Sequence, residues 1–225
     1  QIFYIWWPLA AGWIMMTLEM PIFTAFIARA DNAKINLAAW GVAFPLVLII
    51  ISPGIVFLST STTLSKDWDT FRTGRRYVIV ICAIMTGIHV LVAFTSIFDF
   101  ILKNLIAAPP DVLEPGRLAL QVMLPFCFSL GYRRFHYGVL IRFGYSRAIT
   151  VGVAIRLVVT FAACLILFFL GVSGVMIAAI SITLAVMSEA LYAVWRTTPV
   201  LQNQLKVAPA SEEILTLTGF LKCYI

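Results

Sequence analysis

Residues 148–195 read AITVGVAIRLVVTFAACLILFFLGVSGVMIAAISITLAVMSEALYAVW, and this stretch decides the fold class. It holds two apolar runs of about 20 residues, the length that a helix needs to cross a hydrocarbon core about 30 Å thick. The runs are joined by Gly171-Val172-Ser173-Gly174, a connection so short that the two helices must be antiparallel neighbours. The stretch therefore predicts a transmembrane helical hairpin.

The rest of the chain has the same character. Its 225 residues are 62% hydrophobic and only 12% charged, a composition that excludes a soluble domain. Strands of a membrane barrel would alternate over about ten residues, and no such alternation occurs. We therefore expect an all-α polytopic membrane protein. Six spanning helices are predicted, over residues 3–28, 37–64, 77–106, 117–143, 148–170 and 175–195, with breaks at Pro21, at Pro45 and at Pro53-Gly54.

The predicted helices divide the chain into three parts. Residues 1–196 form a six-helix transmembrane bundle, and the polar residues 197–211 form a cytoplasmic linker. Residues 212–225 begin another apolar helix that is too short to span. Tyr224-Ile225 also repeats Tyr4-Ile5 near the start. We expect the chain to be one of two similar halves, with the second half truncated or supplied by a partner.

Orientation follows from the basic residues of the loops and helix ends. With the N-terminus inside, eight of them lie on the inner side and four on the outer side. The inner set is Lys66, Arg72, Arg75, Arg76, Arg142, Arg147, Arg196 and Lys206; the outer set is Arg29, Lys34, Lys103 and Arg117. We therefore predict an inner-membrane protein with a cytoplasmic N-terminus and a cytoplasmic loop at 66–76. The net charge of +6 is thus a topology signal, and no nucleic-acid partner is expected.

The densest polar cluster within the apolar runs falls in the fourth predicted helix. Arg133, Arg134, His136 and Tyr137 follow one another there, and Arg133, His136 and Tyr137 share one helical stripe with Ser129. A guanidinium stays charged and binds carboxylates or phosphates. Arg133, Arg134, His136 and Tyr137 are therefore candidates for binding an anionic substrate. The alternative is structural pairing with a buried carboxylate. Cys127, Gly131 and Gly138 line a small-residue face suited to close helix packing.

Three further charged residues lie within predicted spans. Arg156 is 15 residues before Gly171 and Glu189 is 15 after Gly174, so the hairpin places them at one depth and predicts a structural ion pair. Glu19 lies two residues before Pro21. Low dielectric disfavours a charged carboxyl, so Glu19 is a candidate for ion coupling, or else a neutral, hydrogen-bonded group.

Sequence motifs for catalysis are missing. The chain has no GxxxxGK[ST], HExxH or GxSxG pattern, so we expect no enzyme. Two histidines and four cysteines without a CxxC pair favour neither a metal site nor a cofactor, and the cysteines are interpreted as packing residues.

The order of motifs resembles one six-helix half of the multidrug and toxic compound extrusion (MATE) type, within the MOP superfamily of flippases and exporters. The resemblance rests on Trp7-Pro8-Leu9, on Ser52-Pro53-Gly54 followed by 61–67, on the stretch from Pro125 through Gly138 to Arg156, on residues 170–175, and on Glu189-Ala190-Leu191-Tyr192. Among the branches it is most similar to the progressive ankylosis group of anion exporters. It implies two bundles whose rocking moves a substrate across the bilayer.

Three functions fit this resemblance. The first is a secondary antiporter that exports an organic anion or amphipathic solute, driven by an ion gradient sensed near Glu19. Three buried arginines against two buried glutamates favour an anionic small molecule. The second is a non-catalytic scaffold subunit of a larger membrane complex, derived from such a transporter. The third is a flippase for a lipid-linked precursor.

Overall fold

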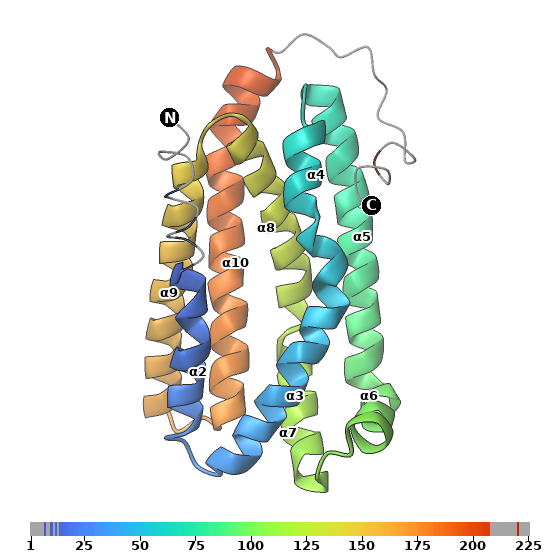
Figure 1. Ribbon diagram of the computed structural model, residues 1–225, viewed down its shortest axis with the longest axis vertical. Helices are drawn as coiled ribbons and strands as arrows, with labels where there is room; N and C mark the ends of the chain where they lie inside the picture. The colour runs from blue at the N-terminus through green and yellow to red at the C-terminus, as the bar shows by residue number, and fades with distance from the viewer. Residues whose placement is uncertain (1–6, 8–9, 11, 13, 208–219, 221–225) are drawn as a thin grey trace.

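The computed structural model describes residues 14–207 together with Trp7, Ala10, Gly12 and Phe220. All regular structure in these residues is helical, and most helices run along one long axis (Figure 1). Four helical stretches are long and apolar enough to cross a membrane, namely Ala33–Leu64, Trp68–Phe94, Ser146–Phe169 and Gly174–Leu205. The prediction of an all-α polytopic membrane protein is confirmed. The beginning of the first predicted span and residues 208–219 and 221–225, including most of the expected further helix, lie outside the described residues.

The first span is interrupted beside its carboxylate. A helical stretch from Ile14 is broken at Leu18, and α2 (Glu19–Ile27) begins one residue later. Pro21 has no amide hydrogen to offer the carbonyl of Thr17, four residues earlier, so the hydrogen-bond ladder fails where the sequence predicts a break. Glu19 therefore lies at the start of α2 rather than inside a continuous helix.

The second span contains one of its two predicted breaks. Helix α3 (Ala33–Ile51) passes into a 3-10 turn (Ser52–Ile55), which contains Pro53-Gly54, and then into α4 (Phe57–Leu64). The break predicted at Pro45 is wrong, because Pro45 lies inside α3. A transmembrane helix tolerates a single proline when its neighbours keep the ladder in place, whereas the pair Pro53-Gly54 combines a missing donor with a flexible residue.

The third span starts earlier than predicted. Helix α5 (Trp68–Phe94) begins directly after Asp67, so most of the expected loop 66–76, including its three arginines, lies on a helix. Asp67 and Thr70 form a capping box, in which the Asp67 carboxylate accepts from the Thr70 amide at 2.8 Å and the Thr70 hydroxyl accepts from the Asp67 amide at 3.1 Å. After α5 the chain turns through α6 (Ile97–Phe100), a π-helix (Ile101–Ile106) and a 3-10 turn (Pro110–Val112).

The remaining helices follow the predicted order with two corrections. The fourth predicted helix is divided into α7 (Leu113–Val122) and α8 (Leu124–Arg142), because Pro125 interrupts the ladder near Met123. Helices α9 (Ser146–Phe169) and α10 (Gly174–Val200) form the predicted hairpin and pack along each other (Figure 1). Helix α10 passes through Pro199 and continues as a π-helical turn (Leu201–Leu205), so residues 197–205 are helical rather than a linker.

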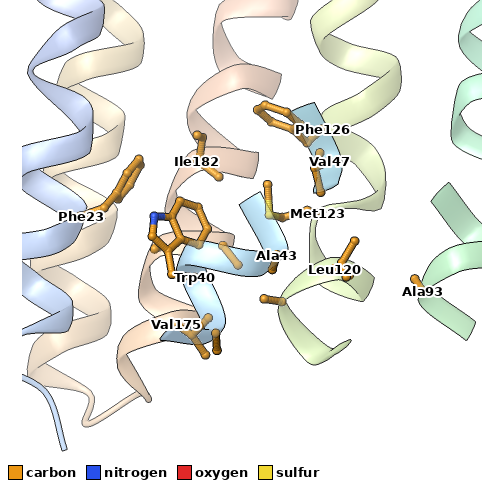
Figure 2. Close-up of a cluster of buried hydrophobic side chains, with 14 of the residues drawn as sticks. Phe23, Trp40, Ala43, Val47, Ala93, Leu120, Met123, Phe126, Val175 and Ile182 are labelled. Carbon is orange, nitrogen blue, oxygen red and sulfur yellow. The ribbon is translucent and has the colours of Figure 1, made fainter. Parts of the chain in front are cut away.

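Two apolar clusters fill the bundle. The first, which we call the apolar cluster, lies toward the α9–α10 turn and includes Phe23, Trp40, Leu120 and Ile182 (Figure 2). Its aromatic rings are in contact: Trp40 packs edge-on against Phe23, with ring centroids 5.5 Å apart. The second cluster lies toward the other end and includes Phe57, Phe71, Phe135 and Val153. Apart from Asp67 at the start of α5, the buried Asp, Glu and Arg residues of the described chain come from α2, α8, α9 and α10, and they lie near the middle of the last three helices.

The ends of the bundle differ in charge as the sequence predicts. The α4–α5 turn, the α8–α9 turn and the end of α10 lie together at one end of the bundle, at the top of Figure 1. These turns and the helix ends beside them carry the eight basic residues assigned to the inner side, and we call this the basic end. The α2–α3 and α9–α10 turns lie at the opposite end.

Candidate functional site

Glu19 is held by two residues of α9. Arg156 donates from Nε to Glu19 Oε1 at 2.8 Å, and its Nη2 makes a second bond to Oε2. The hydroxyl of Thr160, four residues further along the same face of α9, donates to Glu19 Oε1 at 3.1 Å. All three side chains are buried. This carboxylate is therefore ion-paired and hydrogen-bonded rather than isolated.

Glu189 is held by two residues of α8. Its Oε1 accepts from the Tyr137 hydroxyl at 2.9 Å, and its Oε2 is ion-paired with Arg133. Arg133 and Tyr137 are four residues apart, so both reach across to the same point of α10. Arg156 Nη1 lies 3.7 Å from Glu189 Oε2. We call Glu19, Arg133, Tyr137, Arg156 and Glu189 the central network.

The hairpin explains only part of this network. Arg156 and Glu189 do approach within ion-pair distance, at the common depth that the sequence indicates. The shorter contacts join Arg156 to Glu19 and Glu189 to Arg133. Helices α2 and α8 supply these partners, and their distance along the chain gave no sign of the pairing. Arg156 thus stands between two carboxylates.

The network balances its own charge. Two carboxylates face two guanidinium groups, and none of the four is exposed. Removing one partner of such a buried pair would strand the other in a medium that cannot solvate it, at a cost of about 3–5 kcal/mol. The four helices are consequently tied together at mid-depth by directional contacts.

A cavity adjoins the network on the side of the basic end. It has a volume of about 180 Å³ and is lined by Gly12, Met16, Leu58, Arg133, Arg134, Tyr137, Ile141, Ile149, Val153 and Glu189. Arg133, Tyr137 and Glu189 face it as members of the network. Arg134 faces it without a carboxylate partner among the described residues; its Nη1 donates to the Ile55 carbonyl at 3.3 Å. Arg134 therefore adds an unbalanced positive charge to the cavity wall.

His136 is separated from the other three candidates of α8. Its ring is buried against Tyr132 and Phe71, at centroid distances of 4.7 and 6.2 Å. Neither ring nitrogen has a hydrogen-bond partner within the described part of the chain. At about 100° per residue, His136 and Tyr137 point in different directions, so the predicted single stripe is wrong. His136 packs on the α5 side, away from the cavity.

Two glycines set the spacing around the site. A side chain at Gly152 of α9 would place its Cβ 1.9 Å from the Tyr137 hydroxyl oxygen. Tyr137 therefore reaches Glu189 because residue 152 is a glycine, which has no side chain. A Cβ at Gly138 of α8 would lie 2.5 Å from the Leu58 carbonyl oxygen of α4. Thr62 of α4 donates to the Gly138 carbonyl at 3.2 Å in this contact. Gly138 thus packs closely, as the small-residue face predicts.

The chain has no match among protein-family models and none among curated protein sequences. Within the described residues, no three His, Cys, Asp or Glu side chains gather into a group that could hold a metal ion.

Solved structures with the same fold are transporters. An outward-facing multidrug-resistance MATE family transporter of the MOP superfamily is 15% identical, with a TM-score of 0.68, over 96% of this chain and 48% of that one. A MOP superfamily transporter from Pyrococcus furiosus, described as having a binding pocket of reversed polarity, is 16% identical with a TM-score of 0.67, over 96% and 48%. The Vibrio cholerae MATE transporter VcmN in its bent form is 20% identical with a TM-score of 0.68, over 100% and 50%.

The chain therefore has the fold of one half of a MATE-type transporter. It spans about half the length of the solved structures it matches. At these identities the likeness concerns the fold, and the cavity chemistry has to be argued from this chain's own residues.

Proposed function

We propose that this chain is one half of a secondary-active, MATE-like antiporter that exports an organic anion or amphipathic solute by ion-coupled alternating access. The observation that carries the proposal is the cavity beside the central network, whose wall holds Arg134 as an unbalanced cation. The pocket of reversed polarity described for the Pyrococcus furiosus protein supports the idea that this fold hosts cavities of different charge. A second half, covalently linked or separate, would complete the substrate path.

Charge arithmetic within the cavity favours an anion. The charges of Arg133 and Arg156 are balanced by those of Glu19 and Glu189. The repulsion between an incoming cation and Arg134 would therefore not be offset by either carboxylate. An anion would meet a guanidinium that has spare donors, since among the described residues Arg134 makes one hydrogen bond, to a backbone carbonyl. The apolar lining residues, among them Leu58, Ile149 and Val153, suit the hydrocarbon part of an amphipathic solute.

The network offers a route by which Glu19 would couple to this site. A proton on Glu19 would weaken its hold on Arg156, which already lies 3.7 Å from Glu189. Arg156 would then compete with Arg133 for Glu189, and Arg133 would turn its charge toward the cavity. Substrate affinity and the protonation of Glu19 would be linked in this way without direct contact.

The test is anion transport by the intact protein in proteoliposomes. Arg134→Gln removes the unbalanced charge but keeps hydrogen-bonding capacity, so export of an organic anion should fall by tenfold or more, since each 1.4 kcal/mol of lost binding is a factor of about ten. The matched control is Arg29→Gln, which removes an exposed arginine at the opposite end and should leave transport unchanged. Normal anion transport by Arg134→Gln would remove Arg134 from the substrate site.

The same assay separates the alternatives. A scaffold subunit would show no transport with any solute and would remain bound to a host complex on purification. A precursor flippase would move a lipid-linked anion but not a soluble one. The proposal predicts uptake of the soluble anion itself.

Orientation is proposed together with function. We infer an inner-membrane protein with a cytoplasmic N-terminus and with the basic end toward the cytoplasm, because basic residues accumulate on the cytoplasmic side of membrane proteins. A cysteine in place of exposed Lys66, in the α4–α5 turn, should be protected from an impermeant thiol reagent in intact cells and labelled in inverted vesicles. Labelling from outside would reverse the assignment.

A further inference from the structure

A second pocket lies at the basic end, between the first turns of α9 and the last turns of α10. Its volume is about 540 Å³, and its lining residues are Gly144, Tyr145, Ser146, Arg147, Ala148, Val151, Tyr192 and Arg196. It shares no lining residue with the cavity beside the central network. It is therefore a separate site that the transport proposal does not use.

Two arginines give this pocket its charge. Arg196 is held over the ring of Tyr145, with its guanidinium carbon 5.0 Å from the ring centroid. Tyr145 is fixed in turn, because its hydroxyl accepts from Gln204 Nε2 at 3.1 Å. Among the described residues, no acidic side chain pairs with Arg147 or Arg196. Both guanidinium groups thus keep their donors for a ligand.

The surface next to the pocket is apolar. On α9, Val151 in the pocket wall is 49% exposed and Val158, two turns deeper, is 68% exposed. On α10, Leu191 is 71% exposed and Trp195, beside the pocket, is 70% exposed. In a membrane-spanning hairpin these side chains face acyl chains, and tryptophan and tyrosine occupy the headgroup level. The basic pocket therefore opens where the polar and apolar layers of the membrane meet.

We propose that this pocket binds the phosphate-bearing headgroup of an anionic phospholipid, with one acyl chain lying along Val158 and Leu191. Guanidinium groups bind phosphate oxygens through paired, charge-assisted hydrogen bonds, and two arginines without acidic partners supply the complementary charge. The apolar strip below the pocket distinguishes a lipid from a free phosphate. Anionic lipids are concentrated in the cytoplasmic leaflet, which is where the basic bias places this end.

Native mass spectrometry of the intact protein with phosphatidylglycerol and with phosphatidylcholine of the same acyl chains tests the site. Arg147→Gln and Arg196→Gln should each weaken phosphatidylglycerol binding about fivefold and leave phosphatidylcholine binding unchanged. The control Arg76→Gln removes an exposed arginine from α5 at the same end, outside the pocket, and should have no effect. Because Arg147 is exposed, its variant decides the question even if Arg196→Gln does not fold.

A second arm distinguishes lipid from soluble phosphate. Val158→Asn should weaken phosphatidylglycerol binding, because it places a polar amide against an acyl chain, and glycerol phosphate should compete only weakly for the wild-type site. Equal binding by Arg147→Gln and wild type, or an equal loss in Arg76→Gln, would overturn the proposal. Full displacement by glycerol phosphate would identify a small-anion site instead.

Discussion

The apolar cluster and the central network both join α2, α8, α9 and α10, but by different physical interactions. In the apolar cluster, Phe23, Trp40 and Ile182 interlock by packing, which in a bilayer depends on dispersion and close fit (Figure 2). In the central network, four charged groups from α2, α8, α9 and α10 depend on partners at fixed positions. Packing contacts are many and individually small, whereas each network contact is large and specific. Small substitutions should therefore be tolerated in the first region and severe in the second.

The largest expected effect comes from Arg156→Met. This change leaves Glu19 without its cation and should lower the free energy of unfolding by about 3–5 kcal/mol. The measurement is unfolding in mixed micelles, followed by tryptophan fluorescence. Ile182→Val, which deletes one methylene carbon from the apolar cluster, is the comparison and should cost about 1 kcal/mol. Equal losses from the two variants would erase the distinction between the regions.

Glu19→Gln/Arg156→Met shows whether the loss arises from the stranded charge. If the two groups act as a pair, the double variant should be more stable than Arg156→Met alone, with a coupling energy of about 0.5–3 kcal/mol. Simple addition of the two single losses would contradict the paired network.

In the transport assay, Glu19→Gln should also remove the dependence of export on a pH gradient, because a glutamine side chain cannot exchange a proton.

The sequence predicts the helices that carry the apolar cluster better than it predicts the contacts of the central network. Helices α3, α9 and α10 follow from the apolar runs, because spanning length and a short turn leave few alternatives. The predicted start of α5 at residue 77 is too late, although Asp67 and Thr70 carry a capping signal three residues apart. The helical extension through Pro199 was hidden by its polar composition. Errors of this kind concern the ends of helices, where local signals compete.

The sequence identifies the charged residues of the central network and the approach of Arg156 to Glu189, but not the two closest ion pairs. Arg133, Arg156, Glu19 and Glu189 stand out because charge is costly in hydrocarbon. The pairs Glu19–Arg156 and Arg133–Glu189 depend on how α2 and α8 pack against the hairpin, and a single sequence does not encode that packing in any local pattern. His136 shows the same limit, since its angular offset from Tyr137 turns it toward Phe71 and away from the cavity.

A smaller effect is expected from Gly152→Ala, which tests whether close packing holds the network in place. The new Cβ would overlap the Tyr137 hydroxyl, so the tyrosine must move and lose its 2.9 Å bond to Glu189. Overpacking of this kind should cost about 1–3 kcal/mol in the unfolding assay. Gly41→Ala is the matched control, because a Cβ at this position of α3 would meet no atom of another described element within 4 Å, and it should be neutral or stabilise by up to about 1 kcal/mol. Tyr137→Phe removes the same hydrogen bond without added bulk. If displacement of the hydroxyl causes the loss of stability, Gly152→Ala should lower the free energy of unfolding less in the Tyr137→Phe background than in wild type. An unchanged loss would show that Gly152 contributes only to the packing of α9.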